Sequence, residues 1–153
     1  MPSRSAAPLR LLVGGLGSCA MASYHFVLPY AWHWGQRLTS LPPAIRWGSY
    51  SINFFMSYLM LAGGVLTLVA WRRARSGRLA DGGIVAAMAG FWLTNATYQL
   101  LIPLPLPIRL LPLRIALLGF AVLMAGAYLA ALRALRPRSQ EPQASTPRAG
   151  HDR

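Results

Sequence analysis

Long apolar runs alternate with short polar segments along most of the chain. The run from Ser51 to Trp71 contains no charged residue, and a cluster of arginines at positions 72, 73, 75 and 78 follows it directly. A helix of that length is roughly 31 Å long, which matches the hydrocarbon thickness of a bilayer. We therefore predict that this run spans a membrane and that the arginines end it at the water interface.

Three further runs have the same character, and His25 and Arg114 are the only residues within them that carry or can gain a charge near neutral pH. Together the four runs predict an all-α fold, an integral membrane four-helix bundle that crosses the bilayer up, down, up and down. The membrane domain covers residues 1–136, with spans at about 11–30, 51–71, 83–102 and 113–132. The polar, proline-containing residues 137–153 predict a disordered cytoplasmic tail.

The connecting segments carry interface and turn signals. Tyr30, Trp32, Trp34, Trp47 and Tyr50 bracket the first loop and form an interfacial aromatic belt. Two prolines at 42 and 43 interrupt any long helix in that loop, although residues 34–41 suit a short helix on the membrane surface. Prolines at 103, 105 and 107 favour an extended polyproline segment, whereas the proline at 112 suits the first turn of the fourth span.

Asp81 precedes the third apolar run at the position of a helix cap. Its carboxylate can accept hydrogen bonds from the amides of Gly83 and Ile84, and its charge faces the positive end of the helix dipole. We interpret Asp81 as a structural residue and not as a catalytic one.

The first run has a second interpretation. A basic start with Arg4 and Arg10, a short apolar core and the small residues 20–22 together resemble a secretory signal with its cleavage site. Residues 16–19 also resemble a lipoprotein box. Because the apolar run continues through Leu28, we favour an uncleaved span, and the cleaved signal stays an open alternative.

Charge sets the predicted orientation. The chain is 55% hydrophobic and has a formal net charge of +12. Four spans place both termini on one side, and the arginines on that side outnumber those at 37, 46, 109 and 114. The positive-inside rule therefore predicts cytoplasmic termini, with Arg72, Arg73, Arg75 and Arg78 as the main topology-setting residues. Because the arginines flank apolar runs and do not line one folded face, we predict no nucleic-acid binding.

Polar residues inside the predicted spans form the one candidate site. His25, Asn53, Asn95 and Gln99 fall at a similar depth in the outer half of the bilayer, and Ser57 and Tyr98 can join them. An unpartnered polar group in hydrocarbon costs several kcal/mol, so these residues should turn inward. We favour a role as interhelical glue over a ligand or catalytic site. Small residues at 14, 18 and 22, at 64, and at 86 and 90 predict the helix contacts.

The predicted spans lack the side chains that several kinds of catalytic and metal site require. No Asp or Glu lies in a predicted span, which excludes a carboxylate proton relay or carboxylate-held Mg²⁺ there. Haem held by two histidines would need a second histidine within a span, and Cys19 is the single cysteine. We therefore predict no metal site and no cofactor.

These observations predict a multi-pass protein of a bacterial inner membrane. The first hypothesis is a binding or interaction module whose partners are the lipid bilayer and an amphiphilic ligand or a partner membrane helix, with oligomers allowed. A second hypothesis is a small enzyme that uses His25 for isomerase-like proton transfer on a lipid or quinone. A third is a subunit of a pore or transporter, which would need oligomerisation.

Overall fold

The computed structural model describes residues 6–78, 80–103 and 107–135, and these contain helices and no strand. The elements are α1 (Ala6–Ala31), α2 (Trp34–Arg37), α3 (Pro43–Arg75), α4 (Gly82–Leu101), the 3-10 turn η1 (Ile108–Leu110) and α5 (Leu111–Leu135). The predicted all-α class is confirmed.

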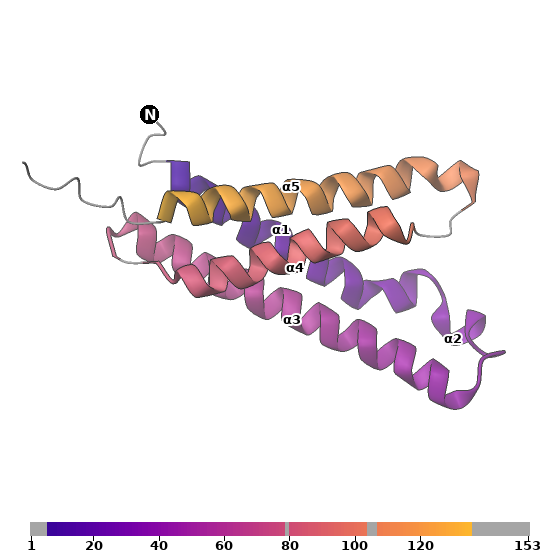
Figure 1. The fold of residues 1–153 in the computed structure, drawn as a ribbon. Coiled ribbons are helices and arrows are strands. Elements are labelled where there is room, and N and C mark those ends of the chain that lie inside the picture. The colour runs from indigo at the N-terminus through magenta and orange to yellow at the C-terminus, as the bar shows by residue number, and fades with distance from the viewer. Residues whose placement is uncertain (1–5, 79, 104–106, 136–153) are drawn as a thin grey trace, which may run out of the picture.

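The four long helices lie side by side along a common direction (Figure 1). Helix α1 packs against both α3 and α5, and α5 packs against α4, whereas α3 and α4 contact each other only briefly. The helices therefore form two pairs, α1 with α3 and α4 with α5, which are joined through α1 and α5. Figure 1 shows the pairs close together near the N-terminus and diverging toward α2.

The two ends of the molecule differ in chemistry. We call the end with Arg72, Arg73, Arg75 and Arg78 the arginine end, and the end with α2 and its flanking tryptophans the tryptophan end; they lie opposite each other (Figure 1). At the arginine end the Arg10 guanidinium donates to the Ala130 carbonyl at 3.2 Å, which ties α1 to α5.

Three helices are long and apolar enough to cross a membrane: Ala7–Ala31, Pro43–Arg75 and Ile108–Leu135. The chain is therefore a membrane protein with three helices that can span a bilayer. Helix α4 has 20 residues, but its final part carries Asn95, Thr97, Tyr98 and Gln99, which lower its hydropathy. The predicted span at 83–102 stays a prediction.

The element boundaries differ from the predicted spans mainly in the first loop. Helix α3 begins at Pro43, well before residue 51, because proline suits the first helical position and residues 44–50 continue the helix. The predicted surface helix at 34–41 is shortened to α2. Pro107 is extended, with φ −53° and ψ 149°, and Pro112 lies in the first turn of α5. Residues 104–106 of the predicted polyproline segment, and the predicted tail 137–153, lie outside the described residues.

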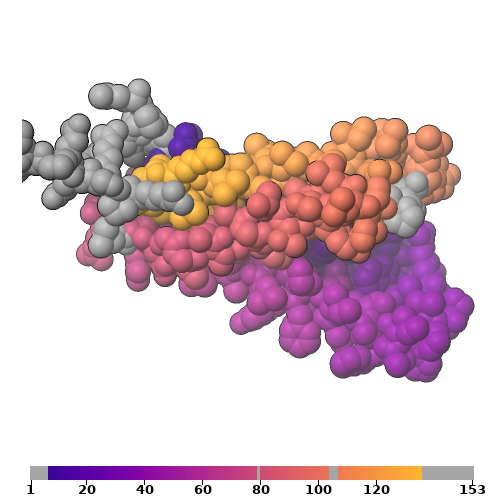
Figure 2. Space-filling view, in the orientation of Figure 1, coloured from indigo at the N-terminus to yellow at the C-terminus, as the bar shows by residue number. Residues whose placement is uncertain are grey.

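Buried residues are confined to the part of each long helix nearer the arginine end. No residue is fully buried on α1 beyond Ala22, on α3 before Ser57, on α4 beyond Ala96 or on α5 before Ala121. Figure 2 shows the α4–α5 pair standing apart from the α1–α3 pair toward the tryptophan end. The interior is therefore closed at one end and open at the other.

Glycines bring α1 close to its neighbours. A Cβ on Gly64 would lie 3.0 Å from the Gly15 carbonyl oxygen, and one on Gly14 would lie 2.9 Å from Cζ of Tyr128. The small-residue face predicted on α1 therefore does contact neighbouring helices. The predicted face at residues 86 and 90 of α4 is wrong, because both residues are exposed and α4 packs through larger side chains. The buried face of α4 consists of Val85, Met88, Ala89, Trp92 and Ala96.

Candidate functional site

Four polar side chains, one from each long helix, meet in the buried interior. Trp92 Nε1 lies 3.0 Å from Ser18 Oγ, and Ser18 Oγ lies 3.0 Å from the Tyr128 hydroxyl. The Tyr128 hydroxyl lies 3.2 Å from Thr67 Oγ1, which in turn donates to the Gly63 carbonyl at 2.7 Å. We call Ser18, Thr67, Trp92 and Tyr128 the central network. All four are buried.

The direction of every hydrogen bond in the central network follows from the number of hydrogens available. Thr67 gives its single hydroxyl hydrogen to Gly63, so its oxygen must accept from Tyr128. Tyr128 has then used its own hydrogen, so Ser18 donates to it and accepts from the Trp92 indole. The chain runs one way from α4 through α1 and α5 to the backbone of α3, and each donor has an acceptor.

The central network is structural, because each of its hydrogen-bond donors already binds an acceptor within the protein. Among the described residues no buried side-chain nitrogen or oxygen lacks a partner. From the sequence, Ser18 is predicted only as a small residue of a helix contact, and Thr67, Trp92 and Tyr128 are not predicted to form a site. The signal that could have found them is a polar-edged aromatic residue in the middle of an apolar run, since such residues normally lie at the interface or need a buried partner.

His25 and Asn53 join α1 to α3 through two hydrogen bonds. Asn53 Nδ2 donates to the His25 carbonyl at 2.8 Å, and Asn53 Oδ1 lies 3.3 Å from His25 Nδ1. Because Oδ1 can only accept, Nδ1 carries the hydrogen. The carbonyl of His25 would normally accept from residue 29, but Pro29 has no amide hydrogen. Asn53 therefore supplies the donor that the proline removes.

This geometry predicts a rescue experiment. Asn53→Leu should destabilise the protein by about 1–3 kcal/mol, because the His25 carbonyl is left without a donor in an apolar environment. In a Pro29→Ala background the alanine amide can donate to that carbonyl, so the same substitution should cost clearly less. Unfolding in mixed detergent micelles measures both differences. Equal costs in the two backgrounds would show that Asn53 does not compensate for Pro29.

Asn95 and Gln99 form a second polar pair on the other side of the molecule. Gln99 Nε2 donates to Asn95 Oδ1 at 2.6 Å, one turn apart on α4. Within the described residues no hydrogen bond connects this pair to His25 or Asn53. The six candidate residues are therefore divided between the two helix pairs.

The remaining candidates lie on their own helices. Ser57 is buried and donates to the Asn53 carbonyl at 2.6 Å, whereas Tyr98 is 60% exposed. Asp81 lies at the N-cap of α4, where Oδ1 accepts from the amides of Gly83 at 2.8 Å and Ile84 at 3.4 Å. The described residues contain no group of three or more His, Cys, Asp or Glu side chains that could hold a metal ion.

Comparisons with protein-family models, curated proteins and solved structures found no match for this chain. The functional argument therefore depends on the arrangement of the chain's own residues.

Proposed function

We propose that this chain is a four-span protein of a bacterial inner membrane that acts as a binding module for a neutral amphiphile. In this proposal α1, α3, α4 and α5 cross the bilayer up, down, up and down, and both termini are cytoplasmic. The distribution of arginines supports this orientation, because a cytoplasmic arginine end agrees with the positive-inside rule. The tryptophan end then lies at the outer surface.

The observation that carries the proposal is the absence of buried residues toward the tryptophan end of all four long helices. There the two helix pairs diverge (Figure 2). Each carries one polar pair, His25 with Asn53 and Asn95 with Gln99. We call the space between the diverging pairs the outer wedge. In a bilayer, molecules with acyl chains would enter such a wedge from the outer leaflet.

The polar groups of α4 indicate the class of ligand. Asn95 Nδ2 and Gln99 Oε1 have no hydrogen bond to another described residue, so the pair can still donate to a carbonyl and accept from a hydroxyl. Helix α4 carries no charged side chain, and Arg114, near the start of its partner α5, is half-buried. The uncharged amides of α4 therefore favour a neutral lipid or quinone headgroup over an ionic one.

The position of His25 favours binding over catalysis. Its Nδ1 hydrogen and its carbonyl are both engaged with Asn53, which holds the imidazole as part of the contact between α1 and α3. This contact also argues for an uncleaved first span, since removing α1 would leave Asn53 and the central network without their partners.

Ligand retention tests the proposal. Purified protein is titrated with dioleoylglycerol and with a short-chain quinone, and native mass spectrometry measures the bound fraction. We expect the wild-type protein to retain at least one of these probes, and Asn95→Leu with Gln99→Leu to weaken retention about tenfold. The matched control is Thr94→Leu with Thr97→Leu, which changes exposed positions on the same helix. Retention of neither probe by the wild type, or equal retention by the two double variants, would contradict the proposal.

A labelling arm tests the orientation. In a Cys19→Ala background, Ser40→Cys lies between α2 and α3, and Ser76→Cys lies at the arginine end of α3. A membrane-impermeant maleimide added to intact cells should label the first variant and should label the second only after the membrane is permeabilised. The reverse pattern would invert the proposed topology.

A further inference from the structure

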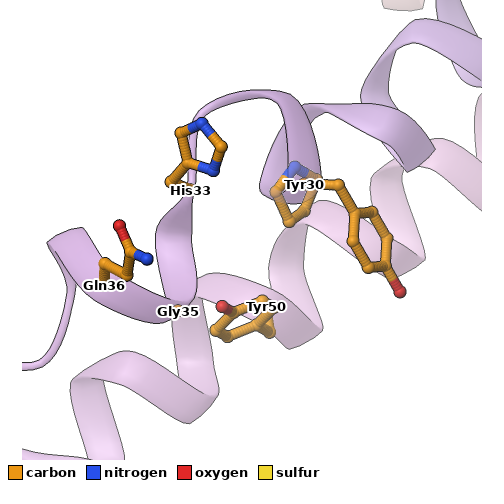
Figure 3. Close-up of a pocket in the computed structure, with 6 residues that line it drawn as sticks. Tyr30, His33, Gly35, Gln36 and Tyr50 are labelled. Carbon is orange, nitrogen blue, oxygen red and sulfur yellow. The ribbon is translucent and has the colours of Figure 1, made fainter.

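A hollow of about 340 Å³ lies at the tryptophan end, in the corner between the end of α1, α2 and the start of α3 (Figure 3). We call it the corner pocket. Trp34 of α2 packs edge to face on Tyr50 of α3, with ring centroids 5.6 Å apart, which fixes one wall. A Cβ on Gly35 would meet nothing within 4 Å, so the floor beside it is open. The pocket is lined by Pro29, Tyr30, His33, Gly35, Gln36 and Tyr50.

Three side chains bring hydrogen-bonding groups to the corner pocket. Figure 3 shows the imidazole of His33 at the turn before α2, the amide of Gln36 beside α2 and the hydroxyl of Tyr50 next to Gly35. None of the three side chains makes a hydrogen bond to another described residue. All three can donate hydrogen bonds into the pocket.

The backbone of His33, which lines the corner pocket, adopts an uncommon conformation. His33 has φ 50° and ψ 47°, the left-handed conformation, which is uncommon for a residue with a side chain. Its carbonyl accepts from the amides of Gln36 and Arg37, both at 3.0 Å, so the turn is fixed by α2. Residues in sparsely populated backbone conformations cluster at functional sites, which supports a binding role for His33.

The segment that forms the corner pocket carries two arginines and no acidic residue, which favours an anion. Arg37 lies over the Trp32 ring, with its guanidinium carbon 5.9 Å from the ring centroid, and Arg46 is in the first turn of α3. The only acidic side chain among the described residues is Asp81, which lies at the arginine end. No carboxylate of the described chain therefore competes for these arginines.

The surroundings favour a lipid over a free anion. Tyr30, Trp34 and Tyr50 are the kind of aromatic residues that lie at headgroup depth in a bilayer. Further from the tryptophan end, Val27 and Phe54 are 57% and 54% exposed, and they continue along α1 and α3 below the pocket. Acyl chains attached to a headgroup in the pocket can cover this apolar surface.

We propose that the corner pocket binds the phosphodiester headgroup of an anionic phospholipid of the outer leaflet. His33, Gln36 and Tyr50 donate to the phosphate oxygens, and the arginines supply the opposite charge. The acyl chains lie along Val27 and Phe54. This site is separate from the outer wedge, which has neutral polar groups and lies between the helix pairs.

Lipid titration tests the assignment. Native mass spectrometry of the purified full chain compares dioleoylphosphatidylglycerol, dioleoylphosphatidylcholine and inorganic phosphate. Both lipids offer the same phosphodiester, but the choline cation of the phosphatidylcholine is repelled by the arginines, so we expect the phosphatidylglycerol to bind about tenfold more tightly. Gly35→Val fills the pocket and should weaken phosphatidylglycerol binding about tenfold or more. Gly48→Val is the matched control, because a Cβ on Gly48 also meets nothing within 4 Å and does not line the pocket.

A second variant keeps the proposal testable if Gly35→Val does not fold. His33→Gly suits the left-handed backbone, so it should preserve thermal stability while it weakens phosphatidylglycerol binding several-fold. Equal binding of the two lipids, or unchanged binding in both pocket variants, overturns the proposal. Inorganic phosphate that binds and displaces the lipid would assign the pocket to the free anion instead. The Asn95 and Gln99 variants should bind phosphatidylglycerol as the wild type does, even where they lose the neutral probe. A failure of the outer-wedge proposal can therefore be distinguished from a failure of the corner-pocket proposal.

Discussion

Gly64→Val is expected to separate α1 from α3 and to destabilise the protein by about 3 kcal/mol or more, at or above the upper range for overpacking. A Cβ on Gly64 would lie 2.7 Å from Cys19 Sγ and 3.0 Å from both the Cys19 nitrogen and the Gly15 carbonyl oxygen. Two of these three obstacles are backbone atoms, which cannot rotate away. The helices must therefore move apart, and the contacts of α1 with α3 are lost along their length.

Unfolding in mixed detergent micelles, followed by helix content, measures this loss. Gly90→Val is the control, since a Cβ on Gly90 meets nothing within 4 Å and the position is exposed. The control should unfold within about 1 kcal/mol of the wild type, as for an exposed glycine in a helix. Similar stabilities for the two valine variants would mean that α1 and α3 do not cross at Gly15 and Gly64.

Tyr128→Phe is expected to cost about 1–3 kcal/mol, because the ring stays and only the central hydroxyl of the network is removed. Ser18 then loses its acceptor and Thr67 loses a donor, both at buried positions. Tyr98→Phe removes the same hydroxyl from a residue that is 60% exposed, and it should be nearly neutral. The same unfolding titration compares the two variants.

A double-mutant cycle separates the hydrogen bond from the loss of packing. Thr67→Val removes the acceptor of Tyr128 while keeping the side-chain volume, and it leaves the Tyr128 hydrogen without its partner. Tyr128→Phe with Thr67→Val should therefore cost less than the sum of the two single variants, with a coupling of about 0.5–3 kcal/mol. Strict additivity would falsify the hydrogen bond between Tyr128 and Thr67.

Much of the fold could be predicted because hydrocarbon-length apolar runs leave few alternatives to helices. The runs at 11–30, 51–71 and 113–132 lie within membrane-capable helices, and Pro112 lies in the first turn of α5 as predicted. The start of α3 at residue 43 was not predicted, because residues 43–50 are not apolar enough to extend the predicted span.

The candidate site was harder to predict, since depth along a helix does not determine which neighbour a side chain faces. His25 and Asn53 lie at similar depth and are in contact, whereas Asn95 and Gln99 face each other on α4 and do not reach the first pair. The role of Asn53 also depends on Pro29, which lies on another helix, and nothing in the spacing of the sequence connects the two.

By itself, the sequence determined that apolar helices would form and where charge would gather, because both properties depend on neighbouring residues in the chain. Only the tertiary structure decided that α1 joins the two pairs, that Ser18, Thr67, Trp92 and Tyr128 meet, and that the helices diverge toward the tryptophan end. Those features depend on the rotation of each helix about its own axis and on how closely glycines let two backbones approach. Such quantities are set by contacts between distant parts of the chain.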